Sequence, residues 1–194
     1  RLEISSGKLQ HWLQKAQITN GLSNNYIRSV IQDRQGFVWV GLWGWGLNRF
    51  NPNTGEWHLY QYDRNNPYSL SYNDVWDLHQ DHYGNIWIGT KGGGLNLYDR
   101  KHDRFYRWGS PRYLSHNGVL TIAESSARNT ASTDSSIGLW IGTENGLNYF
   151  TVNLKKIDSD SIQDVQIVSC HAKNGLPSDI IKSIIEDEQG NIWI

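Results

Sequence analysis

Trp43 and Trp45 are the residues whose type and spacing point most directly to binding chemistry in this chain of 194 residues. They flank Gly44 in a short segment that has the composition of a turn. An exposed indole on a turn is costly unless its flat face meets a partner, so this pair predicts a surface that stacks on sugar rings. The alternative is that each ring packs inside the fold, and the sequence leaves that alternative open.

Charged residues from other parts of the chain complete this hypothesis. Arg28, Lys91, Lys182 and Glu144 would contact polar or acidic substituents of the same ligand, and Trp76 would lie beside them. Tyr72 and His116 stand at equivalent places in neighbouring loops, where packing or plain solvent exposure is the competing interpretation.

Other kinds of chemistry find little support. The glycine-rich run 89–94 is followed by an expected strand, so no helix N-terminus is available to bind phosphate. His79 and His82 flank an expected turn with no further histidine or cysteine placed nearby, which favours a surface turn over a metal site. Asp158 and Asp160 lack the number of ligands that calcium requires. We therefore expect no metal, no cofactor and no catalytic residue.

An internal repeat positions the candidate residues. Tryptophans 39, 87, 140 and 193 follow one another at spacings of 48, 53 and 53 residues. In each unit a leucine precedes the tryptophan. These leucines are at positions 22, 70, 114 and 176, and they precede the four tryptophans by 17, 17, 26 and 17 residues respectively. The third unit therefore carries 9 extra residues, which we place in the polar run 125–136.

Each unit contains four short runs of period-two hydrophobicity, which predict four antiparallel strands. In the first unit these runs are 27–32, 37–41, 47–51 and 57–62. An Asp-x-x-Gly segment joins the first two strands, where the aspartate can accept from backbone amides and glycine can adopt positive φ. Units of this length and composition without helical stretches predict an all-β fold, a β-propeller with four-stranded antiparallel blades.

The repeat also predicts how the chain divides. We expect a half blade over 1–14, blades over 22–62, 70–108 and 114–170, and a second half blade over 176–194. These are about four repeat units of 48–53 residues in a partial ring of a larger propeller. An incomplete ring leaves strand edges and apolar faces that need a neighbour, so further blades of the same propeller are expected partners.

One face of the propeller is expected to bind. The loops from second to third strand, and from the fourth strand to the next blade, emerge together around the central channel. Their sequences differ between units, and the loops from second to third strand are 42–45, 90–93 and 143–145. At one repeat position of the first strand the residue type differs between units, whereas the position before it is always aliphatic. We therefore expect side chains at this variable position to lie outside the core. Its members are Arg28, Trp76, Leu120 and Lys182.

Composition excludes several classes of protein. Eighteen basic side chains against nineteen acidic ones argue against binding to nucleic acid and against direct membrane contact by this segment. No apolar run is long enough to span a membrane, and any export signal must be encoded elsewhere. The single cysteine, Cys170, excludes an internal disulfide.

The joint motif resembles the two-component regulator propeller repeat. It consists of Gly-Leu-Ser-Asn-Asn ending at Asn25, the Asp-x-x-Gly turn, Gly-Asn-Ile-Trp-Ile-Gly-Thr ending at Thr90, and Gly-Gly-Leu-Asn ending at Asn96. The resemblance implies the periplasmic sensor region of a bacterial membrane receptor that responds to oligosaccharides. It also implies a homodimer in the full receptor, with a cytoplasmic histidine kinase or diguanylate cyclase beyond the membrane. The chain departs from the pattern at Trp43, where a small residue is usual, and in the third unit, which lacks the Asp-x-x-Gly turn.

Three functions remain open on the sequence. The leading hypothesis is a non-enzymatic, ligand-binding sensor module. A propeller enzyme of the streptogramin-lyase or glycan-cleaving type would need a paired acid and base, whereas His116, Glu144 and Asp179 fall in different units. A protein-interaction platform is the third alternative, because one fold serves all three functions.

Overall fold

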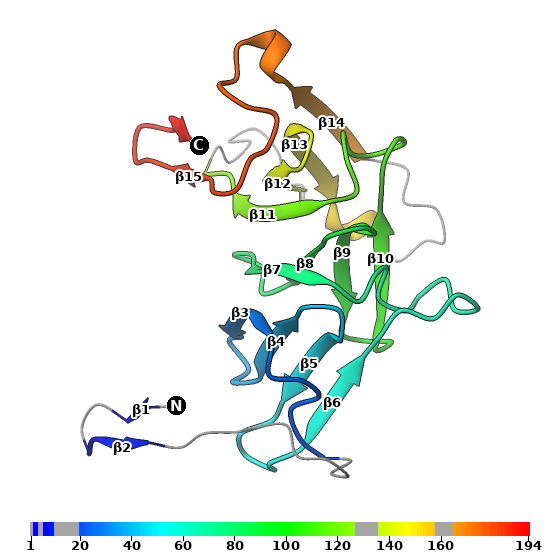
Figure 1. The fold of residues 1–194 in the computed structure, drawn as a ribbon, viewed down its shortest axis with the longest axis vertical. Coiled ribbons are helices and arrows are strands. Elements are labelled where there is room, and N and C mark those ends of the chain that lie inside the picture. Colours follow the sequence, from blue (N-terminus) through cyan, green and yellow to red (C-terminus); the bar gives the residue numbers. More distant parts are fainter. Residues whose placement is uncertain (1, 4–5, 10–19, 127–135, 158–164) are drawn as a thin grey trace.

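Three four-stranded antiparallel sheets make up most of the molecule (Figure 1). The computed structural model describes residues 2–3, 6–9, 20–126, 136–157 and 165–194. Within each of the three sheets the strands lie in chain order, with the first strands toward one side of the molecule and the fourth strands toward the other. The sheets are β3 (Ile27–Gln32), β4 (Val38–Leu42), β5 (Gly46–Phe50) and β6 (Trp57–Tyr60); β7 (Val75–Gln80), β8 (Ile86–Thr90), β9 (Gly94–Asp99) and β10 (Arg104–Trp108); and β11 (Val119–Glu124), β12 (Ser136–Thr143), β13 (Gly146–Asn153) and β14 (Val165–Cys170).

Two smaller sheets lie at either end of the described chain. They are β1 (Leu2–Glu3) with β2 (Lys8–Leu9), and β15 (Ile185–Glu186) with β16 (Ile192–Trp193). The only helical segments among the described residues are two short 3-10 turns, Leu154–Lys156 and Ala172–Asn174. The predicted all-β propeller architecture is therefore confirmed. Most of the expected insertion 125–136 lies outside the described residues.

The aspartate of each Asp-x-x-Gly turn has two roles. Asp33 accepts hydrogen bonds from the backbone N–H groups of Gln35 and Phe37, as the sequence predicted. Its second carboxylate oxygen accepts from the indole Nε1 of Trp39 at 2.9 Å, which the sequence did not show. Asp81 and Asp187 bind Trp87 and Trp193 in the same way.

The third blade replaces this contact with one from its neighbour. It lacks the aspartate, and the indole of Trp140 donates instead to the Glu186 carboxylate of the next sheet at 3.2 Å. The repeated tryptophan thus keeps an acidic acceptor in every blade.

The core lies between the sheets. Trp39 is fully buried with its ring centroid 4.9 Å from that of Tyr98 in the next blade. Trp87 packs against Trp108 of its own blade at 5.7 Å and against Phe150 of the next blade at 6.0 Å. Burial of such rings against one another stabilises the stacking of blades.

A repeated hydrogen bond fixes one face of the molecule. The N–H of Gly46, which opens β5, donates to the backbone oxygen of Asn73 in the loop that enters the next blade. Gly94 and Gly146 donate to Asn117 and Asp179 in the same way. In each blade, the turn between the second and third strands therefore lies against the loop that connects its fourth strand to the first strand of the next blade, as expected. We call the surface formed by these turns and loops the hairpin face.

Candidate ligand-binding face

A β-bulge in the first strand of each blade sets the position of the candidate residues. The strand register shifts between Ile27 and Ser29, between Val75 and Asp77, and between Val119 and Thr121. The extra residues are Arg28, Trp76 and Leu120. A bulge redirects the side chain that it inserts. This explains why that register escapes the aliphatic pattern of its neighbours.

The expectation that this register lies outside the core is wrong for Leu120. Arg28 is exposed and Trp76 is partly buried, whereas Leu120 is only 8% exposed. A leucine gains about 1.5 to 3 kcal/mol from burial, while an arginine gains nothing comparable from burying its charge. The bulge permits either outcome, and the residue type decides between them.

Arg28 connects aromatic rings of two blades. Its guanidinium carbon lies 4.9 Å from the ring centroid of Trp43 and 4.6 Å from that of Trp76. Trp43 also meets the ring of Tyr26 edge to face at 6.1 Å. Cation–π contacts of this kind contribute about 0.5 to 2 kcal/mol each, depending on solvent exposure.

The contacts continue into the third blade through Lys91. Its ammonium lies 4.6 Å from the Trp76 ring centroid and 3.4 Å from the Glu144 carboxylate. The other carboxylate oxygen of Glu144 lies 3.7 Å from Nδ1 of His116. We call this continuous set the cation–aromatic row, consisting of Tyr26, Trp43, Arg28, Trp76, Lys91, Glu144 and His116.

The same backbone contact holds the row in every blade. The N–H groups of Trp43, Lys91 and Glu144 each donate to the residue just before the first strand, at 2.9 to 3.0 Å. Their acceptors are the backbone oxygens of Tyr26, Asp74 and Gly118. The positions are equivalent, and only the side chains differ. A scaffold that repeats while its side chains diverge is what a binding surface requires.

Both rings of the tryptophan pair lie at the surface. Trp43 is 53% exposed and Trp45 is 45% exposed, so neither packs between blades within the described structure. Tyr72, 46% exposed, lies over Gly92, where a side chain carbon would come within 2.9 Å of its ring. Lys182 is exposed, and no contact among the described residues joins it to the row.

The sequence analysis did not identify two residues of this region, Tyr26 and Asp74. They occupy one repeat position, where the third and fourth units have Gly118 and Ile180, and this divergence was the available signal. Asp74 is 9% exposed, and its Oδ1 has no hydrogen-bond partner among the described residues. The Nε1 of Trp76 is likewise buried without a partner there. Such groups favour a ligand or solvent that can supply hydrogen bonds.

Asp77 braces the bulge against the next blade. Its carboxylate accepts hydrogen bonds from the backbone N–H groups of Ile122 at 2.7 Å and Leu78 at 2.9 Å. Burial raises the pKa of Asp77, and these two hydrogen bonds oppose that rise. The carboxylate thus serves as an acceptor inside the scaffold.

The expectation that His116 and Glu144 fall in different units is wrong, because both belong to the third blade and lie 3.7 Å apart there. Nδ1 of His116 accepts a hydrogen bond from the backbone N–H of Gly118 at 2.9 Å, so in the neutral ring that nitrogen is not available as a base. Glu144 already lies between Lys91 and His116. This arrangement offers positioned charges for binding.

Backbone N–H groups of the glycine-rich run 89–94 are hydrogen-bonded within the fold. The N–H groups of Gly92 and Gly94 donate to the backbone oxygen of Asn117, and that of Gly93 donates to the hydroxyl of Thr90. Asp158 and Asp160 lie outside the described residues.

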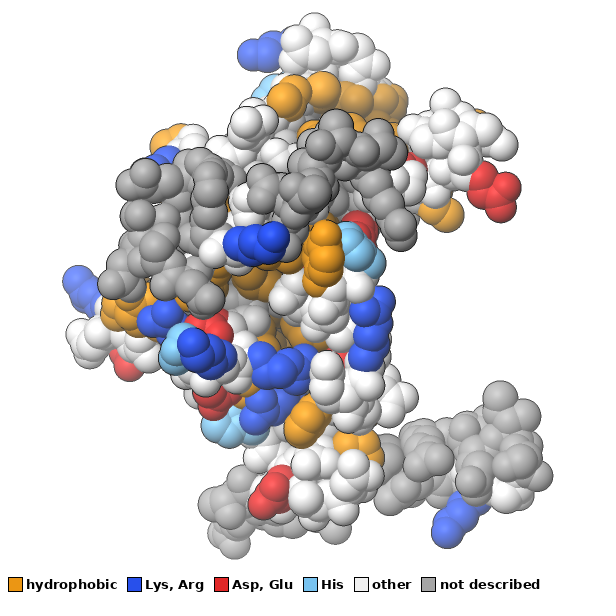
Figure 2. Space-filling view, turned by 180° about the vertical axis from the view of Figure 1, so that it is seen from behind, with side chains coloured by type: hydrophobic (Ala, Val, Ile, Leu, Met, Phe, Trp, Pro, Cys, Tyr) orange, Lys and Arg blue, Asp and Glu red, His pale blue; other side chains and the backbone are white. Residues whose placement is uncertain are grey.

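Beyond the hairpin face, His79 and His82 both face Glu124 of the next blade. The backbone N–H of His82 donates to the Glu124 carboxylate at 2.9 Å, its ring also contacts that carboxylate, and Nε2 of His79 lies 3.8 Å from it. The sequence did not place this acidic residue beside the two histidines. Figure 2 shows that the side turned away from Figure 1 carries further clusters of mixed charge, with basic and histidine side chains beside acidic ones.

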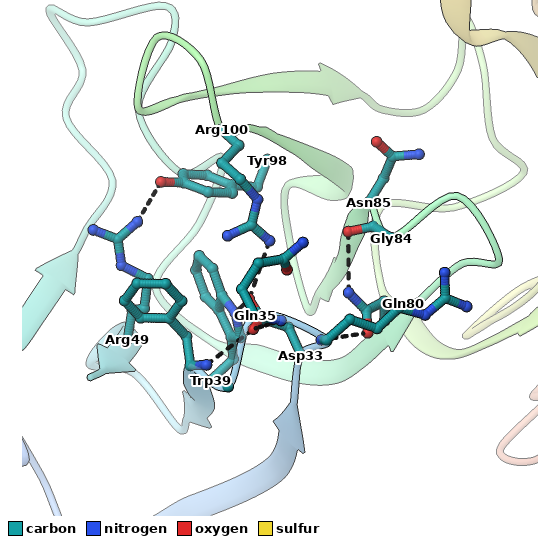
Figure 3. A network of polar contacts seen from close by, with 12 residues as sticks. Asp33, Gln35, Trp39, Arg49, Gln80, Gly84, Asn85, Tyr98 and Arg100 are labelled. Carbon is teal, nitrogen blue, oxygen red and sulfur yellow. Dashed lines mark hydrogen bonds and ion pairs between the residues drawn. The ribbon is translucent and has the colours of Figure 1, made fainter. Parts of the chain in front are cut away.

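A polar network ties the first two blades together around Asp33 (Figure 3). Arg100 reaches Asp33 from the second blade at 3.0 Å, and the Asp33 side chain is fully buried. Arg49 donates to the hydroxyl of Tyr98 at 2.5 Å. Burial and a hydrogen bond to Asp103 raise the pKa of Tyr60, which contacts Tyr98, well above its usual range. These contacts lie inside the interface between the two blades, which indicates a role in stability rather than in ligand binding.

The family comparison matches three segments of the chain. The model described as the two component regulator propeller matches residues 21–44, 69–92 and 175–194. These segments contain Trp43, Arg28, Trp76 and Lys91. The resemblance inferred from the sequence is confirmed. No curated protein matches the chain.

Solved structures agree with the fold. The chain is similar to the extracellular domain described as that of a hybrid two component system, BT3049, from B. thetaiotaomicron, with 26% identity, a TM-score of 0.70 and 94% of this chain covered. The corresponding domain of BT4673 from the same organism gives 28% identity, a TM-score of 0.69 and 96% coverage. PorZ of Porphyromonas gingivalis, at 14% identity, a TM-score of 0.60 and 96% coverage, supports the fold alone.

The chain spans about a quarter of the length of these solved chains, 24% of the first two and 27% of PorZ. Among the described residues, no helix has the length and apolar character needed to cross a membrane.

Proposed function

We propose that this chain, which carries two component regulator propeller repeats, is a ligand-binding part of an extracytoplasmic sensor in a bacterial membrane receptor. The similar solved domains are extracellular parts of two component systems, which supports a location outside the cytoplasm. The periplasm is the specific compartment that we propose. The receptor would signal ligand binding to a cytoplasmic kinase or cyclase. Dimerisation of the receptor would couple ligand binding to the activity of that cytoplasmic domain.

The cation–aromatic row carries the proposal for ligand binding. It places exposed rings and charged groups at the divergent positions of an otherwise repeating face. Flat apolar rings next to hydrogen-bonding groups suit an oligosaccharide, whose ring faces are apolar and whose edges carry hydroxyl groups. Trp43 and Trp45 would stack on sugar rings, with Arg28, Lys91 and Glu144 contacting the substituents. Tyr72, His116 and Lys182 would extend the same face.

A thermal-shift screen against glycan oligosaccharides tests this function. A bound oligosaccharide raises the unfolding midpoint, because it stabilises the folded state by an amount that grows with the logarithm of its concentration relative to Kd. Mass spectrometry of each hit after prolonged incubation then separates binding from turnover. We expect a hit that is recovered intact. Release of shorter or unsaturated products would establish the enzyme alternative, and the absence of any hit would favour a protein-interaction platform.

A further inference from the structure

Arg28 differs from the arginines that brace the blades. Five others donate a hydrogen bond to another residue, namely Arg34, Arg49, Arg100, Arg104 and Arg107. The guanidinium of Arg28 contacts the rings of Trp43 and Trp76 but forms no ion pair or hydrogen bond with any described residue. Its position is thus fixed while its N–H donors are left unused.

Ring contacts and hydrogen bonds use different parts of a guanidinium. The rings of Trp43 and Trp76 attract its charge through their faces, whereas its five N–H groups lie in its own plane. A planar fork of donors matches the paired oxygens of a carboxylate or a sulfate. Because the rings already restrict the side chain, an arriving anion would order it at little further cost in entropy.

Glu144 is the acidic member of the row and lies at the end opposite to Arg28. Glu144 is 3.4 Å from the ammonium of Lys91 and offsets its charge. Asp74 adjoins Lys91 through the hydrogen bond from the Lys91 N–H to the Asp74 backbone oxygen. Arg28 has no such counter-ion in the part of the chain that the structure describes, so an excess of positive charge remains at the end of the row where Trp43 is exposed.

We propose that Arg28 binds an anionic group of the ligand, a carboxylate or sulfate carried on a sugar, and so makes this face selective for acidic oligosaccharides. Trp43 holds the guanidinium on one side and offers its remaining exposed surface to the sugar ring. This inference rests on the proposed function and narrows its ligand class.

Calorimetric titration with matched pairs of oligosaccharides tests the inference. One pair is tetragalacturonate and the neutral galactotetraose made from it by carboxyl reduction, and another is a sulfated galactan tetrasaccharide and its desulfated form. We expect at least one acidic member to bind more tightly than its neutral partner, with affinity falling as salt rises. Arg28→Gln should weaken the acidic ligand about tenfold or more, and Arg28→Lys should weaken it less. Both changes should weaken the neutral partner less than they weaken the acidic member.

Arg112→Gln is the matched control, because Arg112 is an exposed arginine that contacts the Tyr113 ring outside the row. Thermal unfolding of each variant checks that the fold is retained. Equal affinity for the members of every pair, unchanged in Arg28→Gln, would overturn the anion inference and leave the oligosaccharide function standing. If no member of any pair binds, the anion inference fails, and the thermal-shift screen decides the oligosaccharide function separately. If only acidic monosaccharides bind, and their binding depends on Arg28, the result would support the anion site and contradict the proposal that the ligand is an oligosaccharide.

Discussion

The tryptophans of this protein fall into two kinds that residue type alone does not separate. Trp39 and Trp87 are fully buried, and each donates its indole N–H to the aspartate of its own blade. Trp43 and Trp45 are about half exposed. Position within the repeat distinguishes the two kinds, because a residue that recurs in every unit belongs to the blade. A residue that appears once requires another explanation.

The aspartate of the last turn should titrate at unusually low pH. Hydrogen bonds from Trp193 and Asn191 lower the pKa of Asp187 from 3.8 to about 2. Because the folded-state pKa lies below the unfolded value, the stabilisation is fully present above about pH 4 and is lost as pH falls toward 2. We expect the Asp187 carboxyl carbon resonance to titrate near pH 2, with the Trp193 indole proton shifting in parallel. Asp187→Asn should abolish the indole shift, and a midpoint near 4 would contradict the contact.

Replacing Asp33 should be far more damaging than replacing an exposed aspartate. Asp33→Ala leaves the Trp39 indole, the Phe37 N–H and Arg100 without their common acceptor. We expect a loss of about 3 to 5 kcal/mol in the free energy of unfolding, measured by urea denaturation. Asp63→Ala, at an exposed turn with one local hydrogen bond, should cost less than about 1 kcal/mol. Similar losses in the two variants would contradict the role of Asp33 between blades.

At the scale of elements, the bulge explains what the sequence pattern could and could not predict. Period-two hydrophobicity placed β3 at residues 27–32, as found. The bulge adds one residue without breaking that pattern visibly, so only the odd composition of the register signalled it. Composition could not tell that Leu120 would turn inward while Arg28 would not. That outcome depends on the space that neighbouring strands leave around each bulge, and the sequence of one strand does not specify that space.

Two neighbouring glycines separate backbone strain from steric conflict. Gly44 and Gly46 both have positive φ, of 74° and 88°. A Cβ at Gly44 meets nothing within 4 Å, whereas one at Gly46 would lie 2.2 Å from the backbone oxygen of Tyr60. We expect Gly44→Ala to lower the free energy of unfolding by about 1 kcal/mol and Gly46→Ala by about 3 kcal/mol or more. Equal effects in chemical denaturation would show that the close approach of β5 to β6 does not constrain this turn.

At the scale of the whole molecule, the contacts between blades lay beyond what the sequence could predict. The repeat identified the turns, the strands and the face on which unlike residues gather. It did not reveal that Arg28 meets Trp76, that Lys91 meets Glu144, or that Glu186 replaces the missing aspartate for Trp140. Each of these contacts joins residues 46 to 53 positions apart, at distances set by how the sheets stack. Short-range patterns carry no information about that stacking.

The central claim is that the exposed rings of the hairpin face bind the ligand. Its most direct test is calorimetric titration of the oligosaccharide found in the thermal-shift screen into the Trp43→Ala, Trp45→Ala double variant. Tyr83→Ala is the control, because Tyr83 is equally exposed at 49% but lies in the Asp-x-x-Gly turn away from the row. We predict that the double variant remains folded and binds at least about tenfold more weakly, while the control binds like the unaltered protein. Unchanged affinity in the double variant, or its wholesale unfolding, would contradict the claim.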